Sequence, residues 1–203
     1  MRVLDIMSKP VVTVTQETPA KQAAGLLAAH GFTALPVVDD DERLVGIVTE
    51  ADLMADRIPR DARFSRLDAC ERHPGATVAE VMTTPATAMG PGTELAVLAR
   101  ALLEARIRAM PIVDGARVVG IVTRGDIVRT FARGDADIAA DVRHHLAIYG
   151  GADRWHVQVR DGIVDIADEF DDGTDRHVAT LLAQSVPGVV RAHAMAAHQS
   201  GNS

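Results

Sequence analysis

The pattern of hydrophobic and polar positions repeats along the first two thirds of the chain. The apolar run 44–49 returns at 118–123, and both copies contain Gly-Ile-Val-Thr with an aspartate three residues after the threonine. Further upstream, Met-x-x-Pro recurs at an offset of 75 residues. Self-similarity of this kind indicates an internal repeat. The sequence therefore predicts two related units, at about 3–54 and 78–128.

Each unit has the spacing expected of the order β-α-β-β-α. A short helical turn and a brief extended segment, at 11–14 and 86–89, come first. Alanine and leucine at helical spacing then predict an amphipathic helix, in the first unit with Thr18 as N-cap and Pro19 as first helical residue. Two apolar strands follow, joined in the second unit by the turn Asp114-Gly115. A second helix begins near each aspartate of the repeated motif, and the apolar faces of the two short sheets can bury each other.

Residues 134–196 have a different pattern, which predicts the order α-β-β-α-β. The expected elements are a helix at 135–149 with Ile138, Val142 and Leu146 on one face, strands at 155–160 and 163–166 around the turn Asp161-Gly162, a helix at 173–185 carrying Val178, Leu181 and Leu182, and a last strand ending near Ala194. The fold class is therefore α/β (α+β), with two repeated units and one smaller domain.

The domain boundaries follow from these patterns. We predict units at 1–58 and 78–133, a polar and arginine-rich linker at 59–77, a third domain at 134–196, and a disordered tail at 197–203. The linker is expected to hold a short helix at 62–72 with a solvated surface, a phosphate contact being the less favoured alternative.

Composition and charge argue against several classes of function, namely membrane-spanning, nucleic-acid-binding and metal-binding proteins. No apolar run is long enough to predict a membrane span, and the chain enters its first repeat at once, so a cytoplasmic protein is expected. The net charge is −1 for residues 1–133 and −6 for 134–203, which argues against nucleic acid as a partner. The single Cys70 fits a reducing compartment, and the eight histidines lack the spacing of metal ligands.

The motif Thr-x-x-Asp, at 49–52 and 123–126, stands where a strand is followed by a helix. A threonine there can accept hydrogen bonds from the first free amides of the helix, whose N-terminus favours phosphate. The aspartate can accept two hydrogen bonds, the number that a ribose diol offers. The alternative is a plain N-cap with a first-turn acid. One isolated copy would favour that alternative, but two copies behind matching strands favour the binding role.

On these motifs, together with the Met-x-x-Pro and apolar-Pro strands, residues 3–128 resemble a tandem pair of CBS domains (cystathionine-β-synthase type), called a Bateman module. The resemblance implies a pseudo-two-fold pair with two clefts for adenosyl ligands such as AMP, ADP, ATP or S-adenosylmethionine. It also implies a homodimer through these modules. Each cleft would take its Thr-x-x-Asp from one unit and its remaining contacts from the other.

Carried over by position, the resemblance assigns candidate contacts to both clefts. Cleft one would use Thr13, Phe32 and Thr33 with Thr123 and Asp126, and cleft two would use Ala88, Ile107 and Arg108 with Thr49 and Asp52. The strand prolines Pro36 and Pro111, and Arg124 beside the second motif, complete the set. Because Ala88 replaces the threonine of the family pattern and cleft one has an aromatic ring at Phe32, we expect cleft one to bind about tenfold tighter.

Residues 135–196 resemble a BON domain in the helix with Ile138 and Val142, in Val157–Ile166 and in Val186-Pro-Gly-Val189. This resemblance implies contact with phospholipid or protein, although Ala167 stands where the family has a glycine. The acidic balance makes membrane lipid the less favoured of the two, so a protein partner is expected.

The sequence thus predicts a regulatory adenosyl-nucleotide-binding protein with its output through the BON-like domain, without catalytic or metal-binding residues. Two alternatives stay open. One is a structural adaptor with empty, degenerate clefts. The less favoured one is an enzyme on adenosyl substrates that uses Asp52 or Asp126 as a base.

Overall fold

The computed structural model describes residues 1–55, 75–151, 153–170 and 172–197. The chain forms two compact units, Met7–Arg124 and a second that combines Met1–Ile6 with Gly125–Ser203. The predicted helix at 62–72, Cys70 and nearly all of the predicted tail lie outside the described residues. Within those residues, no helix has the length and apolar content required to cross a membrane.

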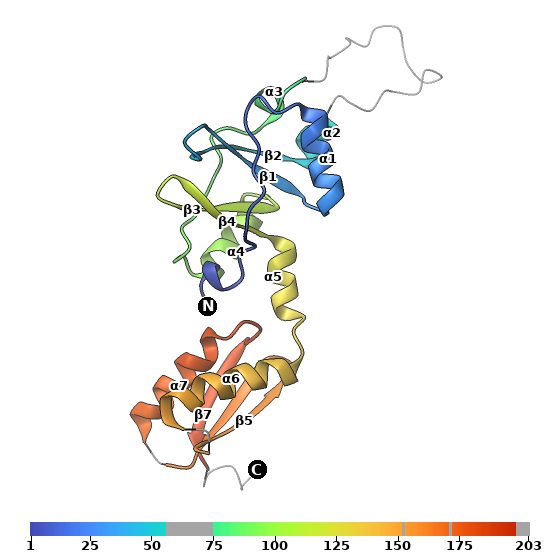
Figure 1. Ribbon diagram of the computed structural model, residues 1–203. Coiled ribbons are helices and arrows are strands. Elements are labelled where there is room, and N and C mark those ends of the chain that lie inside the picture. Colours follow the sequence, from blue (N-terminus) through green and yellow to red (C-terminus); the bar gives the residue numbers. More distant parts are fainter. Residues whose placement is uncertain (56–74, 152, 171, 198–203) are drawn as a thin grey trace, which may run out of the picture. The chain divides into compact units, whose positions relative to one another are not determined.

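In the unit Met7–Arg124, each repeat contributes an antiparallel hairpin and a helix that packs against it (Figure 1). The first repeat holds α1 (Ala20–His30), β1 (Ala34–Val38), β2 (Leu44–Thr49) and α2 (Glu50–Met54), and the second holds α3 (Val78–Val81), α4 (Leu95–Glu104), β3 (Ala109–Asp114) and β4 (Arg117–Thr123). These elements confirm the predicted fold class.

The start of α1 differs from the prediction. Pro19 is the N-cap, because the Thr18 hydroxyl takes part in a local turn, where it accepts a hydrogen bond from the Thr15 backbone N–H at 3.1 Å. The end of the helix follows the sequence signal, since Gly31 adopts a φ of 65° that glycine reaches without steric cost. The buried face of α1 consists of Ala20, Ala23 and Leu27.

The predicted extended segments at 11–14 and 86–89 each reduce to a single parallel bridge. Val14 donates its N–H to the Pro36 carbonyl at 3.1 Å and accepts from the Val38 N–H at 2.9 Å. The next bond of a parallel ladder would need an N–H at Pro36, which proline lacks. In the second copy, Pro111 prevents the pairing from extending to residues before Met89 for the same reason. The strand prolines therefore limit both segments to one residue.

The turn between β3 and β4 lies one residue further along than predicted. Strand pairing continues until Asp114 lies opposite Arg117, so the two turn residues are Gly115 and Ala116. Gly115 has a φ of 62°, which suits the first central position of a tight hairpin turn.

The Met-x-x-Pro segment of each repeat pairs with the hairpin of the other repeat. Ser8 exchanges backbone hydrogen bonds with Ile121 at 2.9 and 3.2 Å, and Thr83 does the same with Ile47 at 2.9 and 3.0 Å. The two repeats thus exchange equivalent segments, which gives the unit its internal symmetry.

The glycine of each Gly-Ile-Val-Thr makes room for the methionine of the opposite repeat. A Cβ added at Gly120 would lie 2.4 Å from Sδ of Met7. A Cβ at Gly46 would lie 2.8 Å from Sδ of Met82 and 3.0 Å from the Thr83 carbonyl oxygen. Glycine and methionine are therefore two halves of one contact, which is why both recur in each repeat.

We expect Gly46→Ala to lower the free energy of unfolding by about 1–3 kcal/mol, the usual range for an overpacked contact. The added methyl group meets a backbone carbonyl that cannot move without weakening the Thr83–Ile47 bridge. The control is Gly25→Ala in the exposed part of α1, where a Cβ meets nothing within 4 Å. That change should stabilise the helix by up to about 1 kcal/mol. Urea denaturation measures both, and equal effects would contradict the proposed contact.

The second compact unit contains η1 (Val3–Asp5), the helix α5 (Arg124–Phe131) from Gly125 onward, and a small α-β-β-α-β domain. The domain consists of α6 (Asp135–Gly150), β5 (Trp155–Arg160), β6 (Ile163–Asp168), α7 (Gly173–Ser185) and β7 (Arg191–Ala196). Its sheet has the order β5-β6-β7, with the first pair antiparallel and the second parallel. The predicted order of elements and the turn Asp161-Gly162 are confirmed.

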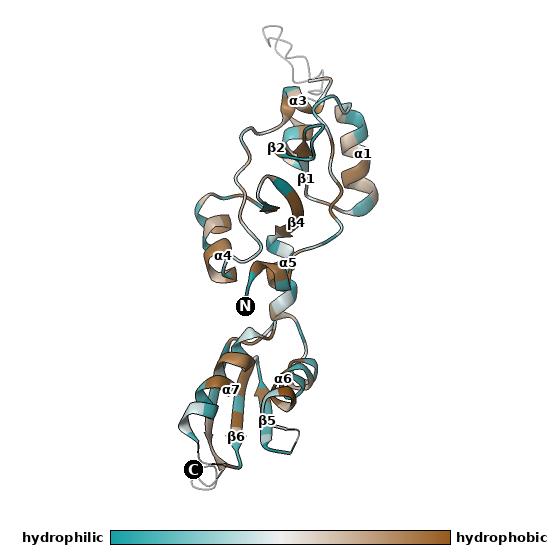
Figure 2. Ribbon diagram, turned by 60° about the vertical axis from the view of Figure 1, so that its left-hand side comes forward, coloured by the Kyte–Doolittle hydropathy of each residue, from teal (hydrophilic) through white to brown (hydrophobic). Residues whose placement is uncertain are grey.

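Buried and exposed positions alternate along β6, so one face of this sheet packs against the helices (Figure 2). The core includes Ile138, Val142 and Leu146 of α6, as predicted. On α7 the prediction is partly wrong, since Leu181 is 52% exposed whereas Ala179 and Ala183 are fully buried. Small side chains at the contact let α7 approach the sheet and α6 closely, and this sets which face of the helix turns inward.

A buried ion pair joins the end of β6 to the loop before β5. Arg154 holds Asp168 through two hydrogen bonds, of 2.8 and 3.1 Å, and contacts Asp175 at 2.6 Å. The Arg154 guanidinium also lies over the ring of Trp155, 4.4 Å from its centroid. Burial by itself would raise the pKa of Asp168, but the hydrogen bonds from Arg154 and from the Phe170 backbone N–H outweigh it and hold that pKa below its usual value.

Candidate functional site

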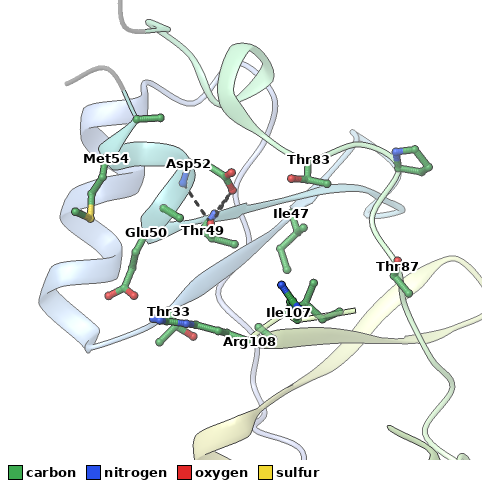
Figure 3. A pocket seen from close by; sticks show the side chains of 15 residues that line it. Thr33, Ile47, Thr49, Glu50, Asp52, Met54, Thr83, Thr87, Ile107 and Arg108 are labelled. Atoms are coloured by element: carbon green, nitrogen blue, oxygen red, sulfur yellow. Dashed lines mark hydrogen bonds between the residues drawn. The ribbon is translucent and has the colours of Figure 1, made fainter. Parts of the chain in front are cut away.

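A pocket of about 840 Å³ lies within the unit Met7–Arg124 (Figure 3). Four segments form its wall: the start of β1, the junction of β2 with α2, the Met-x-x-Pro segment of the second repeat, and the loop from α4 into β3. The lining residues are Thr33, Ile47, Thr49–Asp52, Met54, Ala55, Thr83, Pro85, Thr87 and Arg106–Ala109. Both repeats therefore contribute to one pocket.

The first Thr-x-x-Asp motif forms a reciprocal cap at the start of α2. The Asp52 carboxylate oxygen Oδ2 accepts hydrogen bonds from the Thr49 backbone N–H and from its hydroxyl, both at 2.8 Å. Thr49 Oγ1 in turn accepts from the Asp52 N–H at 3.3 Å. The N-cap function inferred from the sequence is thus confirmed. The other oxygen, Oδ1, has no hydrogen-bond or ion-pair partner among the residues that the structure describes.

Two arginines bring positive charge to the pocket. Arg106 takes a φ of 55°, the left-handed conformation that ends α4, and Arg108 lies just before β3. Within the described ranges neither guanidinium makes a hydrogen bond or an ion pair. Figure 3 shows the Arg108 side chain extending toward Thr33 and Glu50. The pocket therefore contains acidic groups together with two cationic groups that have no partner among the described residues.

Thr33 adds a polar atom without a partner. Its backbone carbonyl accepts the Glu50 N–H at 3.2 Å, which is how β1 meets α2. Its hydroxyl Oγ1 is buried and has no hydrogen-bond partner in the described part of the chain. A buried hydroxyl of this kind costs free energy unless something bonds to it. A polar ligand in the pocket would supply that partner.

The structure brings together four of the residues assigned to cleft two, namely Thr49, Asp52, Ile107 and Arg108. Ala88 is not in the lining, and Thr87, one residue earlier, is. Thr33, which the sequence assigned to cleft one, lines this same pocket. It does so because the register of the hairpin pairs its neighbour Ala34 with Thr49.

The other candidates of the unit Met7–Arg124 are used differently. Phe32 stacks on His30, with ring centroids 5.0 Å apart, and packs against the core of the first repeat. Arg124 donates to the Leu102 carbonyl at 2.7 Å, near the end of α4. The remaining candidates are Thr13, which is exposed, Pro36 and Pro111, which are buried in β1 and β3, and Thr123, which ends β4. Asp126 belongs to the other compact unit and is paired there with Arg129.

Sequence reasoning missed four polar residues of the pocket, namely Glu50, Thr83, Thr87 and Arg106. Two of them lie inside motifs that the sequence analysis had already identified. Glu50 lies inside the Thr-x-x-Asp motif, and Thr83 lies inside Met-x-x-Pro. Thr87 and Arg106 each directly precede a residue that the sequence did assign to a cleft, Ala88 and Ile107. Only the exchange of segments between the repeats shows that these side chains meet.

The comparisons with known proteins agree with this architecture. The family model of the CBS domain matches residues 3–57 and 78–133, which is more than half of the chain. The chain therefore belongs to the CBS domain family, and its two repeats are a tandem CBS pair. The second matched range ends at residue 133.

Solved CBS pairs show the same fold. The CBS pair of protein MJ0100, in complex with 5′-methylthioadenosine and S-adenosyl-L-methionine, is 30% identical, with a TM-score of 0.54 over 65% of this chain and 96% of that one. CBSX2 in complex with AMP is 32% identical, with a TM-score of 0.53 over 63% of this chain and 94% of that one.

Among curated proteins, the chloroplastic CBS domain-containing protein CBSX1 of Arabidopsis thaliana is 33% identical over 57% of each chain. An uncharacterized protein of Methanocaldococcus jannaschii, MJ1404, is 28% identical over 95% of this chain and 42% of its own length. The chain thus spans little more than half of the first of these relatives and less than half of the second.

Proposed function

We propose that the pocket binds an adenine nucleotide, and that the protein uses this binding for regulation. The observation that carries the proposal is the presence in one pocket of a carboxylate oxygen of Asp52, a buried hydroxyl of Thr33 and two arginines, none of them committed to a partner among the described residues. A nucleotide presents the complementary groups: a ribose diol, a polar base edge and an anionic phosphate.

The charges of the lining residues indicate which part of the nucleotide each of them would contact. The Asp52 carboxylate suits the hydroxyls of the ribose, since an ionised carboxylate only accepts hydrogen bonds. Arg106 and Arg108 suit phosphate, which a planar guanidinium binds through two parallel hydrogen bonds. Thr83 and Thr87 add hydroxyls on the segment between. These pairings favour AMP, ADP or ATP over ligands without a phosphate. The AMP complex of CBSX2 supports the choice.

The remainder of the proposal concerns output and assembly. The order α6-β5-β6-α7-β7 supports a BON-like domain that contacts a protein partner. Exposed apolar side chains, Val97 and Leu103 on α4 and Val128 and Phe131 on α5, support a homodimer through the CBS pair. We place the protein in the cytoplasm and give it a binding role without catalysis.

Calorimetric titration with AMP, ADP, ATP, S-adenosylmethionine and 5′-methylthioadenosine tests the proposal. The three nucleotides should bind more tightly than 5′-methylthioadenosine, whose thioether brings no negative charge. Arg108→Gln should weaken AMP binding about tenfold or more, because one charge-assisted hydrogen bond contributes about 1.5–3 kcal/mol. The same change should leave 5′-methylthioadenosine within about twofold, because that ligand gives the arginine nothing to bind.

Arg100→Gln on the exposed surface of α4 is the matched control, since it removes the same charge outside the pocket lining. An equal loss for AMP and 5′-methylthioadenosine in Arg108→Gln would show that the arginine shapes the pocket rather than binding phosphate. If none of the five adenosyl ligands binds, the proposed function is overturned.

A further inference from the structure

The two copies of Thr-x-x-Asp differ in the helical turn after the aspartate. Three residues after Asp52 stands Ala55, whereas three residues after Asp126 stands Arg129. On a helix, side chains three residues apart are neighbours, so an arginine at this position can reach the aspartate. The residues between threonine and aspartate also differ, Glu50-Ala51 against Arg124-Gly125, but among the described residues only the second motif has a cation three residues after its aspartate.

Asp126 is committed to that arginine. Its carboxylate oxygen Oδ1 forms an ion pair with the Arg129 guanidinium. The Asp126 side chain is 7% exposed and that of Arg129 is 73% exposed. The backbone of the same residue is also held, because Thr130 donates its hydroxyl to the Asp126 carbonyl at 3.0 Å. A nearly buried carboxylate is therefore neutralised by a cation that reaches it from the solvent side.

Asp52 has no such cation among the residues that the structure describes. Its Oδ2 is held by the hydroxyl and amide of Thr49, both neutral donors, and no ion pair to Asp52 occurs among the described residues. The helix α2 ends at Met54, and the position three residues after Asp52 is the uncharged Ala55. Among the described residues, therefore, no cation competes with a ligand for Asp52.

We propose that Arg129 acts as an internal counter-ion of Asp126 that competes with a ribose diol, so that the first motif is the preferred adenosyl site. This inference rests on the proposed function and deepens it. A diol must displace a charged guanidinium from Asp126, but meets only neutral hydrogen bonds at Asp52. Because Arg129 is mostly exposed, it can return to water when displaced, so the second motif is weakened rather than abolished. The ranking is the reverse of the one expected from Phe32 and Ala88.

Calorimetric titration of the full-length protein with AMP tests the inference. The wild type should show one tight site per chain and a second phase at least tenfold weaker. Arg129→Gln should tighten the weak phase about tenfold and leave the tight phase unchanged, because the glutamine removes the competing charge. Arg129→Lys should stay close to the wild type, since it restores a cation. Asp126→Asn should affect only the weak phase, and Arg100→Gln should affect neither.

Two results would overturn the inference. One is a wild type with two equal sites. The other is a loss of affinity in Arg129→Gln, which would show that the arginine binds the ligand instead of competing with it. Failure of the proposed function has a different signature. If neither the wild type nor Arg129→Gln binds AMP, both ideas fall, whereas binding that appears only in Arg129→Gln supports the counter-ion and rejects a tight site at Asp52.

Discussion

Arg154→Met is expected to destabilise the C-terminal α-β-β-α-β domain by about 3–5 kcal/mol, the usual cost of removing one partner of a buried ion pair. The change leaves the carboxylate of Asp168, a residue that is 1% exposed, without the guanidinium that holds it. It also removes the contacts of the guanidinium with Asp175 and with the rings of Trp155 and Phe170. Trp155 is the single tryptophan of the chain and is 5% exposed, so its fluorescence reports the unfolding of this domain directly.

Arg160→Met is the matched control for that experiment. Arg160 is exposed at the end of β5 and has no hydrogen bond or ion pair among the described residues. Its loss should change the free energy of unfolding by no more than about 0.5 kcal/mol. The double change Arg154→Met with Asp168→Leu should regain much of the lost stability, because no unpaired charge then stays buried. If Arg154→Met costs no more than Arg160→Met, the ion pair does not support the domain.

Asp52→Asn is expected to weaken the binding of AMP by about 10- to 100-fold, since hydrogen bonds to a charged acceptor contribute about 1.5–3 kcal/mol. The amide oxygen of asparagine can still accept from the backbone N–H and hydroxyl of Thr49, so the cap of α2 is retained. The variant loses the negative charge and the second acceptor oxygen, for which the described residues supply no partner. Calorimetry gives the affinity, and thermal unfolding shows whether the fold is kept.

Asp5→Asn is the matched control, because it makes the same change from carboxylate to amide at a residue outside the pocket. Asp5 also accepts a backbone hydrogen bond three residues back, from Arg2 at 2.7 Å, but it lies outside the pocket lining. AMP affinity should be unchanged in this variant. An Asp52→Asn protein with wild-type affinity would mean that the carboxylate only caps the helix, which is the plainer interpretation of the motif.

The features that the sequence determined by itself depend on interactions between residues that are close together along the chain. The repeat, the order of helices and strands, and the cap at Thr49 and Asp52 depend on hydrophobic period and on hydrogen bonds within a few residues. Such signals are complete in the sequence, because the partners are neighbours along the chain. The family resemblance added the crosswise pairing, which groups Ile107 and Arg108 with Thr49 and Asp52, and all four line the pocket.

Only the tertiary structure decided which other side chains share the pocket and which candidates are used elsewhere. Thr33 joins Thr49 through the register of β1 with β2, and Thr87 enters through a segment exchanged between the repeats. The commitment of Asp126 to Arg129 depends on side-chain direction and burial. Register and segment exchange depend on contacts between residues far apart in sequence. The Asp126–Arg129 pair depends on the direction in which each side chain points. A pattern of residue types along the chain does not encode these geometries.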